Sequence, residues 1–147
     1  MNLEARSSAS VPGLVCSPTS GRALSVLLVD DDPFMLGILE EMLLDRGVRR
    51  VSRTSGGTAA LASMAGMAAH PDLIMCDLNM PGGDGFQFMQ ELGALQYSGA
   101  VVLMSGMDLR TMHSAALMAR FHRLRIVGSL GKPISASSLG AVLANVG

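Results

Sequence analysis

Apolar residues alternate along this chain between short continuous runs and segments with helical spacing. The runs cover residues 25–29, 73–76, 100–104 and 126–130, and a shorter mixed segment covers 50–54. A continuous apolar run of this length is typical of a strand buried on both faces of a parallel sheet. The helices predicted after these strands are 33–46, 58–68, 85–95, 109–121 and 137–145. Strands and helices in alternation predict one doubly wound α/β sheet.

The first helix has the clearest boundaries. Asp32 can accept a hydrogen bond from the first turn, and Pro33 suits the first helical position, where its missing N–H is not needed. Gly47 suits the left-handed position that often follows a last turn. We therefore predict that this helix starts at Pro33 and stops before Gly47.

Residues 1–24 differ in composition from the rest of the chain. They are rich in serine, contain two prolines and show no apolar periodicity. They also lack the apolar stretch of about 7–15 residues that a signal peptide needs. We predict a disordered N-terminal tail over residues 1–24 and a single domain over residues 25–147.

The overall composition argues against several classes of protein. Apolar residues make up 49% of the chain, yet no apolar run approaches the roughly 18 residues of a membrane span. The net charge of -1 gives no nucleic-acid-binding footprint. Cys16 and Cys76 lie far apart, as is typical of thiols in a reducing compartment rather than of a disulfide framework. We expect a cytoplasmic protein with neither a membrane nor a nucleic-acid partner.

Polar side chains follow four of the predicted strands. They are Asp30 with Asp31, then Asp77, Ser105 and Lys132. The carboxyl ends of parallel strands share one edge of the sheet, and α/β proteins bind ligands at that edge. Carboxylates gathered there repel one another unless a cation neutralises them, and Mg²⁺ prefers oxygen ligands. The sequence therefore predicts a site for a divalent cation and a phosphoryl group.

Asp77 is the candidate nucleophile of this site. A carboxylate beside a bound cation can attack phosphorus and form an aspartyl phosphate. Lys132 would supply positive charge, Ser105 a hydroxyl group, and Gly106 both space and a free backbone N–H. Each residue alone is unspecific. The information lies in their order, with separations of 46, 28 and 27 residues along the series 31, 77, 105 and 132.

With these residues identified, the chain resembles the receiver domains of two-component response regulators. The matching segments are 26–33 (V-L-L-V-D-D-D-P), 72–85 (D-L-I-M-C-D-L-N-M-P-G-G-D-G), 102–106 (V-L-M-S-G) and 131–133 (G-K-P). The pattern D-x-N-M-P-x-x-D-G is the most specific of them. The resemblance covers residues 24–146. It implies a flavodoxin-like sheet with strand order 2-1-3-4-5 and helices on both faces.

The resemblance implies roles for the residues that would meet the phosphoryl group. Asp77 looks like the phosphoacceptor. Ser105 looks like the hydroxyl that moves to meet the phosphoryl group, and Lys132 like the cation that contacts it. The family also typically has a cis peptide bond after this lysine, here between Lys132 and Pro133.

A divalent cation, Mg²⁺ or Mn²⁺, is implied in the same way. The ligands would be Asp31, Asp77 and the backbone carbonyl of Asn79, with Asp30 acting partly through water. Phosphate would come from a sensor histidine kinase or a histidine phosphotransfer protein. The domain would catalyse only its own phosphorylation and dephosphorylation, and would otherwise not be an enzyme.

One position departs from the family pattern. Many receivers carry Tyr or Phe three positions before the lysine, where this chain has Ser129. The aromatic side chain that follows the switching hydroxyl is therefore missing. The coupling is absent or replaced, with Met104, Met107 or Leu130 as candidates. This concerns the conformational switch and not the phosphorylation chemistry.

The partner surface is expected on the fourth helix, fifth strand and fifth helix, as is common in receivers. A basic stretch with Arg120, His122, Arg123 and Arg125 lies there. We expect a monomer or weak dimer. None of the three histidines follows a strand end or has ligand spacing, so we assign them no role.

Three other interpretations stay open. The chain could be the N-terminal receiver of a larger regulator, and residues 125–133 faintly resemble receivers joined to cyclic-di-GMP phosphodiesterase domains. It could be a pseudo-receiver that only docks partners. The segment Asp30-x-Asp32 also fits a phosphatase nucleophile motif, but no Asp or Glu follows Lys132 to complete such a site.

Overall fold

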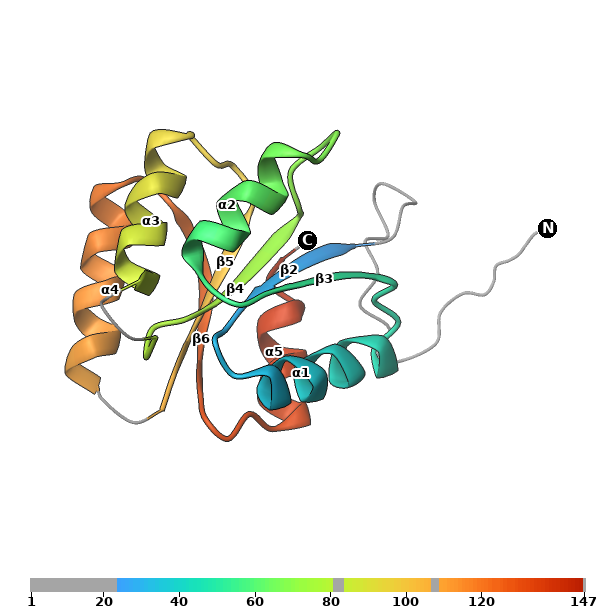
Figure 1. Cartoon of the computed structure of the whole chain (residues 1–147). Coiled ribbons are helices and arrows are strands. Elements are labelled where there is room, and N and C mark those ends of the chain that lie inside the picture. Colours follow the sequence, from blue (N-terminus) through green and yellow to red (C-terminus); the bar gives the residue numbers. More distant parts are fainter. Residues whose placement is uncertain (1–23, 81–83, 107–108, 147) are drawn as a thin grey trace.

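A computed structural model describes residues 24–80, 84–106 and 109–146 of the chain. In these residues, five parallel strands form one sheet (Figure 1). The strands are β2 (Ser25–Val29), β3 (Arg50–Thr54), β4 (Leu73–Asp77), β5 (Ala100–Ser105) and β6 (Arg125–Gly131). Their spatial order is β3-β2-β4-β5-β6, which confirms the predicted order 2-1-3-4-5.

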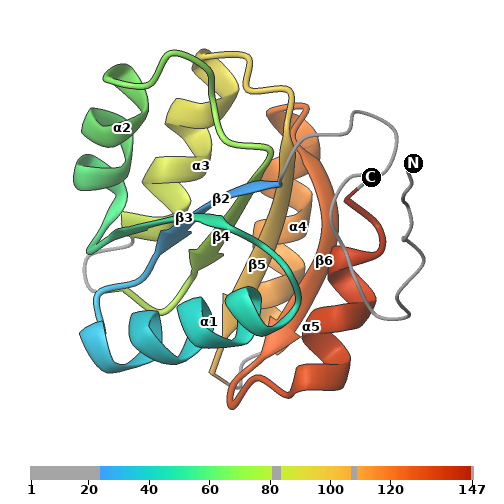
Figure 2. The same ribbon diagram turned by 90° about the vertical axis from the view of Figure 1, so that its right-hand side faces the viewer.

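Helices cover both faces of the sheet (Figure 2). They are α1 (Pro33–Asp45), α2 (Gly57–Ala65), α3 (Asp84–Ala94), α4 (Leu109–Phe121) and α5 (Ala136–Leu143). One buried cluster joins α1 and α5 to one face, and a second joins α2, α3 and α4 to the other. In β2, Val26 and Leu28 belong to the first cluster and Leu27 and Val29 to the second, because successive strand residues point to opposite faces.

Helix α1 starts at Pro33 as predicted and ends at Asp45, one residue before the predicted end at 46. The side chain of Asp32 accepts a hydrogen bond from the N–H of Phe34, and Pro33 occupies the first helical position. Gly47 follows the C-cap residue Arg46 and has a φ of 89°, in the left-handed region that glycine tolerates best. Capping residues therefore determined both ends of this helix.

The second helix ends at Ala65, three residues before the predicted end at 68. The N–H groups of Gly66 and Met67 donate to carbonyls three residues back, at Ser63 and Met64, which tightens and ends the last turn. The predicted N-terminal tail over residues 1–24 reaches one residue too far, because Leu24 is buried in the core. The rest of that tail, residues 1–23, lies outside the described residues.

The strand register brings the polar residues together. Asp77 pairs with Met104, and Ser105 pairs with Gly131, so β4, β5 and β6 end side by side. The N–H of Lys132 donates to the carbonyl of Ser105 at 2.8 Å, which extends this ladder past the end of β6. In the described part of the chain, every helix is too short or too polar to cross a membrane.

Candidate functional site

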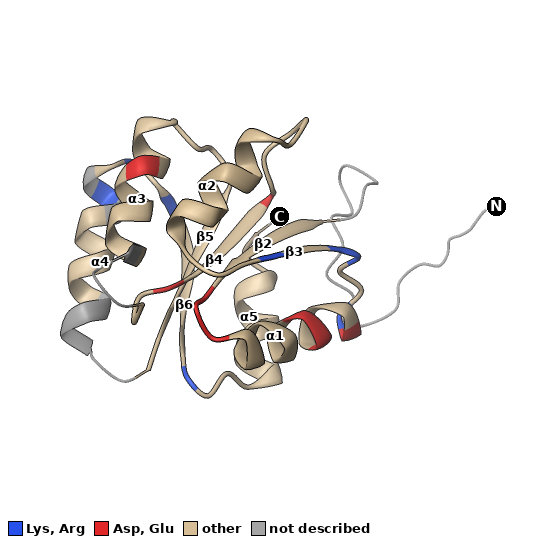
Figure 3. Ribbon diagram, in the orientation of Figure 1, with Lys and Arg blue, Asp and Glu red and all other residues tan. Residues whose placement is uncertain are grey.

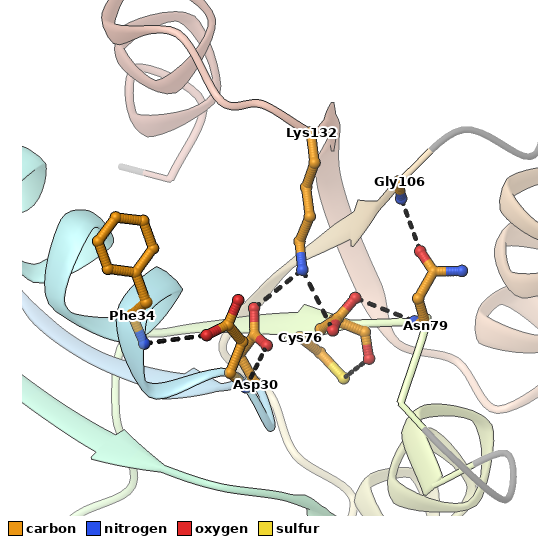
Figure 4. A network of polar contacts seen from close by, with 8 residues as sticks. Asp30, Phe34, Cys76, Asn79, Gly106 and Lys132 are labelled. Atoms are coloured by element: carbon orange, nitrogen blue, oxygen red, sulfur yellow. Dashed lines mark hydrogen bonds and ion pairs between the residues drawn. The ribbon is translucent and has the colours of Figure 1, made fainter.

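Acidic residues lie on the loop after β2 and at the end of β4, along one edge of the sheet (Figure 3). The Lys132 ammonium reaches into this edge from the loop after β6. Its Nζ lies 3.0 Å from Asp30 Oδ2 and 3.2 Å from Asp77 Oδ2 (Figure 4). Both carboxylates are almost fully buried, whereas the lysine side chain is 21% exposed. One cation therefore holds two buried anions that would otherwise repel each other.

Asp31 gives the site a third carboxylate, and it is exposed. Asp30, Asp31 and Asp77 each offer one oxygen atom, and these three atoms lie within 4.8 Å of one another. A hard cation such as Mg²⁺ takes carboxylate oxygens and keeps several waters. The donor set and its spacing fit such an ion, with Asp31 on the solvent side where water ligands can stay.

Both carboxylate oxygens of Asp30 make contacts within the protein that the sequence does not reveal. Its Oδ1 accepts a hydrogen bond from the N–H of Asp32 at 2.9 Å, while its Oδ2 pairs with Lys132. Both oxygens thus already have a partner within the protein. This arrangement is compatible with the implied indirect role of Asp30 at the metal, since a water can bridge from an oxygen that keeps its protein partner.

Burial raises the pKa of the Asp77 carboxyl, and the nearby charge of Asp30 acts in the same direction. The N–H of Asn79 and the ammonium of Lys132 oppose this rise without cancelling it. Burial alone would lower the pKa of Lys132, but its hydrogen bond to Asp30 and the charge of Asp77 raise it overall. The metal-free site therefore keeps the lysine charged and binds a proton on Asp77 more readily than an exposed aspartate would.

Ser105 contributes a buried hydroxyl that has no partner in the part of the chain that the structure describes. Its side chain is almost fully buried, and its Oγ makes no hydrogen bond to any of the residues described. Buried polar atoms are normally paired, and an orphan calls for an explanation. A phosphoryl oxygen on Asp77, whose strand adjoins that of Ser105, would supply the missing partner.

Asn79 connects the ends of β4 and β5. Its backbone N–H donates to Asp77 Oδ1 at 2.9 Å, and its side-chain Oδ1 accepts from the N–H of Gly106 at 2.6 Å (Figure 4). The prediction that Gly106 offers a free N–H is therefore wrong for this structure. The second contact joins two loops that are distant in sequence, so nothing in the local pattern could reveal it.

The peptide bond between Lys132 and Pro133 is cis, which confirms that prediction. Ser129, at the position of the family aromatic, is exposed, whereas Met104 and Leu130 are buried in the core. Met107, the third candidate for the missing coupling, lies outside the described residues. Two of the three candidates therefore lie in the packed core, each directly before the last residue of its strand.

Gly85 is a site residue whose role the sequence did not reveal. It lies at the start of α3, directly against the phosphoacceptor candidate. A Cβ at this position would lie 2.6 Å from the backbone oxygen of Asp77 and 3.3 Å from the Cα of Leu78. Both atoms are backbone atoms and have little freedom to move away. Only glycine allows α3 to approach the end of β4 this closely.

We expect Gly85→Ala to lower the free energy of unfolding by about 1–3 kcal/mol, because the added methyl group would press against the backbone of Asp77 and Leu78. Urea unfolding followed by circular dichroism measures the change. Gly66→Ala is the matched control. Its Cβ would meet only the carbonyl of Ser63 at 3.7 Å, and we expect a change of under about 0.5 kcal/mol. Equal stability of the two variants would contradict the close approach at Gly85.

The chain is similar in sequence and in fold to known proteins. The model of the response regulator receiver domain family matches residues 26–144. The two-component response regulator ARR14 of Arabidopsis thaliana is 39% identical over 88 residues, which are 60% of this chain and 22% of that protein. The cyclic di-GMP phosphodiesterase RocR of Pseudomonas aeruginosa is 28% identical over 120 residues, which are 82% of this chain and 30% of that protein. The chain thus spans less than a third of the length of these relatives.

Solved structures share the fold along nearly their whole length. A response regulator from Colwellia psychrerythraea is 25% identical, with a TM-score of 0.71 over 83% of this chain and 94% of that chain. A chain of the CheX–CheY–BeF₃–Mg complex from Borrelia burgdorferi has a TM-score of 0.76 over 89% of this chain and 94% of that chain, at 17% identity. At that identity the second likeness concerns the fold alone.

Proposed function

Because the chain belongs to the response regulator receiver domain family, we propose that Asp77 accepts a phosphoryl group in a Mg²⁺-dependent reaction that changes partner binding. Receiver domains are phosphorylation-dependent switches that bind Mg²⁺ at an acidic pocket. The observation that carries the proposal for this chain is the buried site itself. Lys132 bridges Asp30 and Asp77, and the Ser105 hydroxyl, which has no partner among the described residues, lies at the end of the next strand.

The proposed reaction forms a bond between a carboxylate oxygen of Asp77 and phosphorus. The bond that breaks joins phosphorus to the donor, which is a nitrogen of phosphohistidine or an oxygen of acetyl phosphate. The leaving group takes the bonding electron pair. A divalent cation held by Asp30, Asp31, Asp77 and the backbone carbonyl of Asn79 would neutralise charge that gathers on the phosphoryl oxygens. Lys132 and Ser105 would contribute the remaining positive charge and hydrogen bonding.

The specific partners are part of the same proposal. A sensor histidine kinase or a histidine phosphotransfer protein would supply the phosphoryl group, as for receivers in general. A downstream protein would bind the surface of α4, β6 and α5, where Arg120, Arg123 and Arg125 are exposed. The domain would catalyse only its own phosphorylation and dephosphorylation, and we expect it in the cytoplasm.

The phosphodiesterase activity in the name of RocR belongs to that protein, of which this chain matches 30%.

Intact-mass measurement after incubation with acetyl phosphate tests the proposal. In the presence of Mg²⁺ we expect the full chain to gain the mass of one phosphoryl group, and without Mg²⁺ we expect almost no gain. Borohydride reduction of the acyl phosphate, followed by peptide mapping, should place the modification at Asp77. No uptake under any condition would overturn the proposal and favour a domain that only docks partners.

A further inference from the structure

We propose that the Asn79 side chain occupies the Gly106 N–H in place of a phosphoryl oxygen and so opposes the phosphorylated state. Asn79 is then a positioning residue, because it would act on the phosphoryl group through the backbone of Gly106. This role rests on the proposed function, since it concerns a phosphoryl group on Asp77. It is distinct from the role of the Asn79 backbone carbonyl at the metal.

Two hydrogen bonds of Asn79, together called the clamp, link the end of β4 to the end of β5. Residue 79 makes two hydrogen bonds in opposite directions, one from its N–H to Asp77 Oδ1 at 2.9 Å and one from the Gly106 N–H to its Oδ1 at 2.6 Å. The clamp therefore ties the end of β5 to the carboxylate that would carry the phosphoryl group (Figure 4).

Two neighbouring hydrogen-bond donors at the end of β5 differ in whether they have a partner. The Ser105 hydroxyl is buried and has no partner in the described residues, whereas the Gly106 N–H is satisfied by Asn79. A phosphoryl group on Asp77 would bring several strong acceptor oxygens to this place. Charge-assisted hydrogen bonds to such oxygens are roughly twice as strong as bonds to a neutral amide.

Asn79 and a phosphoryl oxygen on Asp77 would compete for the Gly106 N–H. The Gly106 N–H has a single hydrogen, so a phosphoryl oxygen gains it only when Asn79 releases it. Asn79 is exposed, and water can satisfy its amide after release. The release is therefore readily reversible, but it loses the net stabilisation that the Asn79–Gly106 hydrogen bond gives to the unphosphorylated site. The free energy of a typical intramolecular hydrogen bond corresponds to a factor of about 3–10 in an equilibrium constant.

The affinity for BeF₃⁻, a stable mimic of the phosphoryl group, tests this role at saturating Mg²⁺. The full chain is compared with Asn79→Ala and with Gln90→Ala, which removes an exposed carboxamide on α3. We expect Asn79→Ala to bind BeF₃⁻ about 3–10 times more tightly than the wild type. The control should stay within about twofold, the scale of a surface substitution away from special features.

Amide hydrogen exchange at Gly106, measured by NMR without ligand, gives a second readout that needs no binding. We expect exchange to be several-fold faster in Asn79→Ala than in the wild type, because the clamp is lost. Equal or weaker BeF₃⁻ binding by Asn79→Ala, or unchanged Gly106 exchange, overturns the role of Asn79 and leaves the proposed function intact. A wild type that fails to bind BeF₃⁻ overturns the proposed function, and the role of Asn79 with it.

Discussion

Asp77→Asn is expected to abolish Mg²⁺-dependent phosphoryl uptake from acetyl phosphate. The amide oxygen that replaces the carboxylate is a poor nucleophile, and the amide removes one of the three carboxylates that gather at the site. The geometry should survive, because an amide oxygen can still accept the hydrogen bond from the Asn79 N–H. Intact-mass measurement records the loss. Asp45→Asn, which neutralises an exposed carboxylate at the end of α1, should leave uptake unchanged.

The same variant should change how stability depends on pH. Burial raises the pKa of Asp77 in the folded protein above its ordinary value of 3.8, so the folded state holds this proton at pH values where the unfolded chain has released it. The metal-free wild type should therefore lose stability as pH rises through the interval between 3.8 and the raised pKa. Asp77→Asn should lack this decrease. Urea unfolding at a series of pH values without Mg²⁺ measures this decrease, and identical pH profiles of the two proteins would contradict the raised pKa of Asp77.

Lys132→Met is expected to lower the free energy of unfolding of the metal-free protein by about 2–4 kcal/mol. The substitution leaves Asp30 and Asp77 buried without their shared cation, and breaking a buried pair on one side is strongly destabilising. The loss of stability should be slightly smaller than for a fully buried ion pair, because the lysine side chain is 21% exposed. Phosphoryl uptake should also slow by about 100-fold or more, since one preorganised charge is lost.

Added Mg²⁺ should return much of the lost stability to Lys132→Met, because the ion supplies positive charge to the same carboxylates. Thermal or urea unfolding with and without Mg²⁺ separates the two contributions. Arg53→Met is the matched control. Arg53 pairs with Glu40 at 3.3 Å on the surface, and its removal should cost under about 1 kcal/mol. A lysine variant no less stable than this control would show that Asp30 and Asp77 do not depend on Lys132.

The elements and most of the site could be predicted from the sequence because each depended on a local signal. Continuous apolar runs identified the strands that are buried between two helix layers. Asp32 and Gly47 marked the ends of α1 through capping chemistry. Asp77, Ser105 and Lys132 could be expected to meet because parallel strands bring their carboxyl ends to one edge.

The remainder depended on tertiary contacts that no local pattern records. The bond between Asn79 and Gly106 joins the ends of two strands whose loops are 27 residues apart. The requirement for glycine at position 85 arises from the backbone of β4 and not from a turn in its own segment. The early end of α2 has no local signal, because alanine and methionine continue an apparently helical pattern past Ala65.

Lys132 is the single lysine in the 147-residue chain. Isotope labelling with lysine therefore places one spectroscopic reporter in the molecule, at the ammonium between Asp30 and Asp77. Metal binding, phosphoryl transfer and partner docking can each be followed through that one resonance, without substitutions or attached probes. Amine-selective reagents will likewise modify this side chain and the N-terminus, and the extent of labelling at Lys132 will depend both on its access to solvent and on its raised pKa.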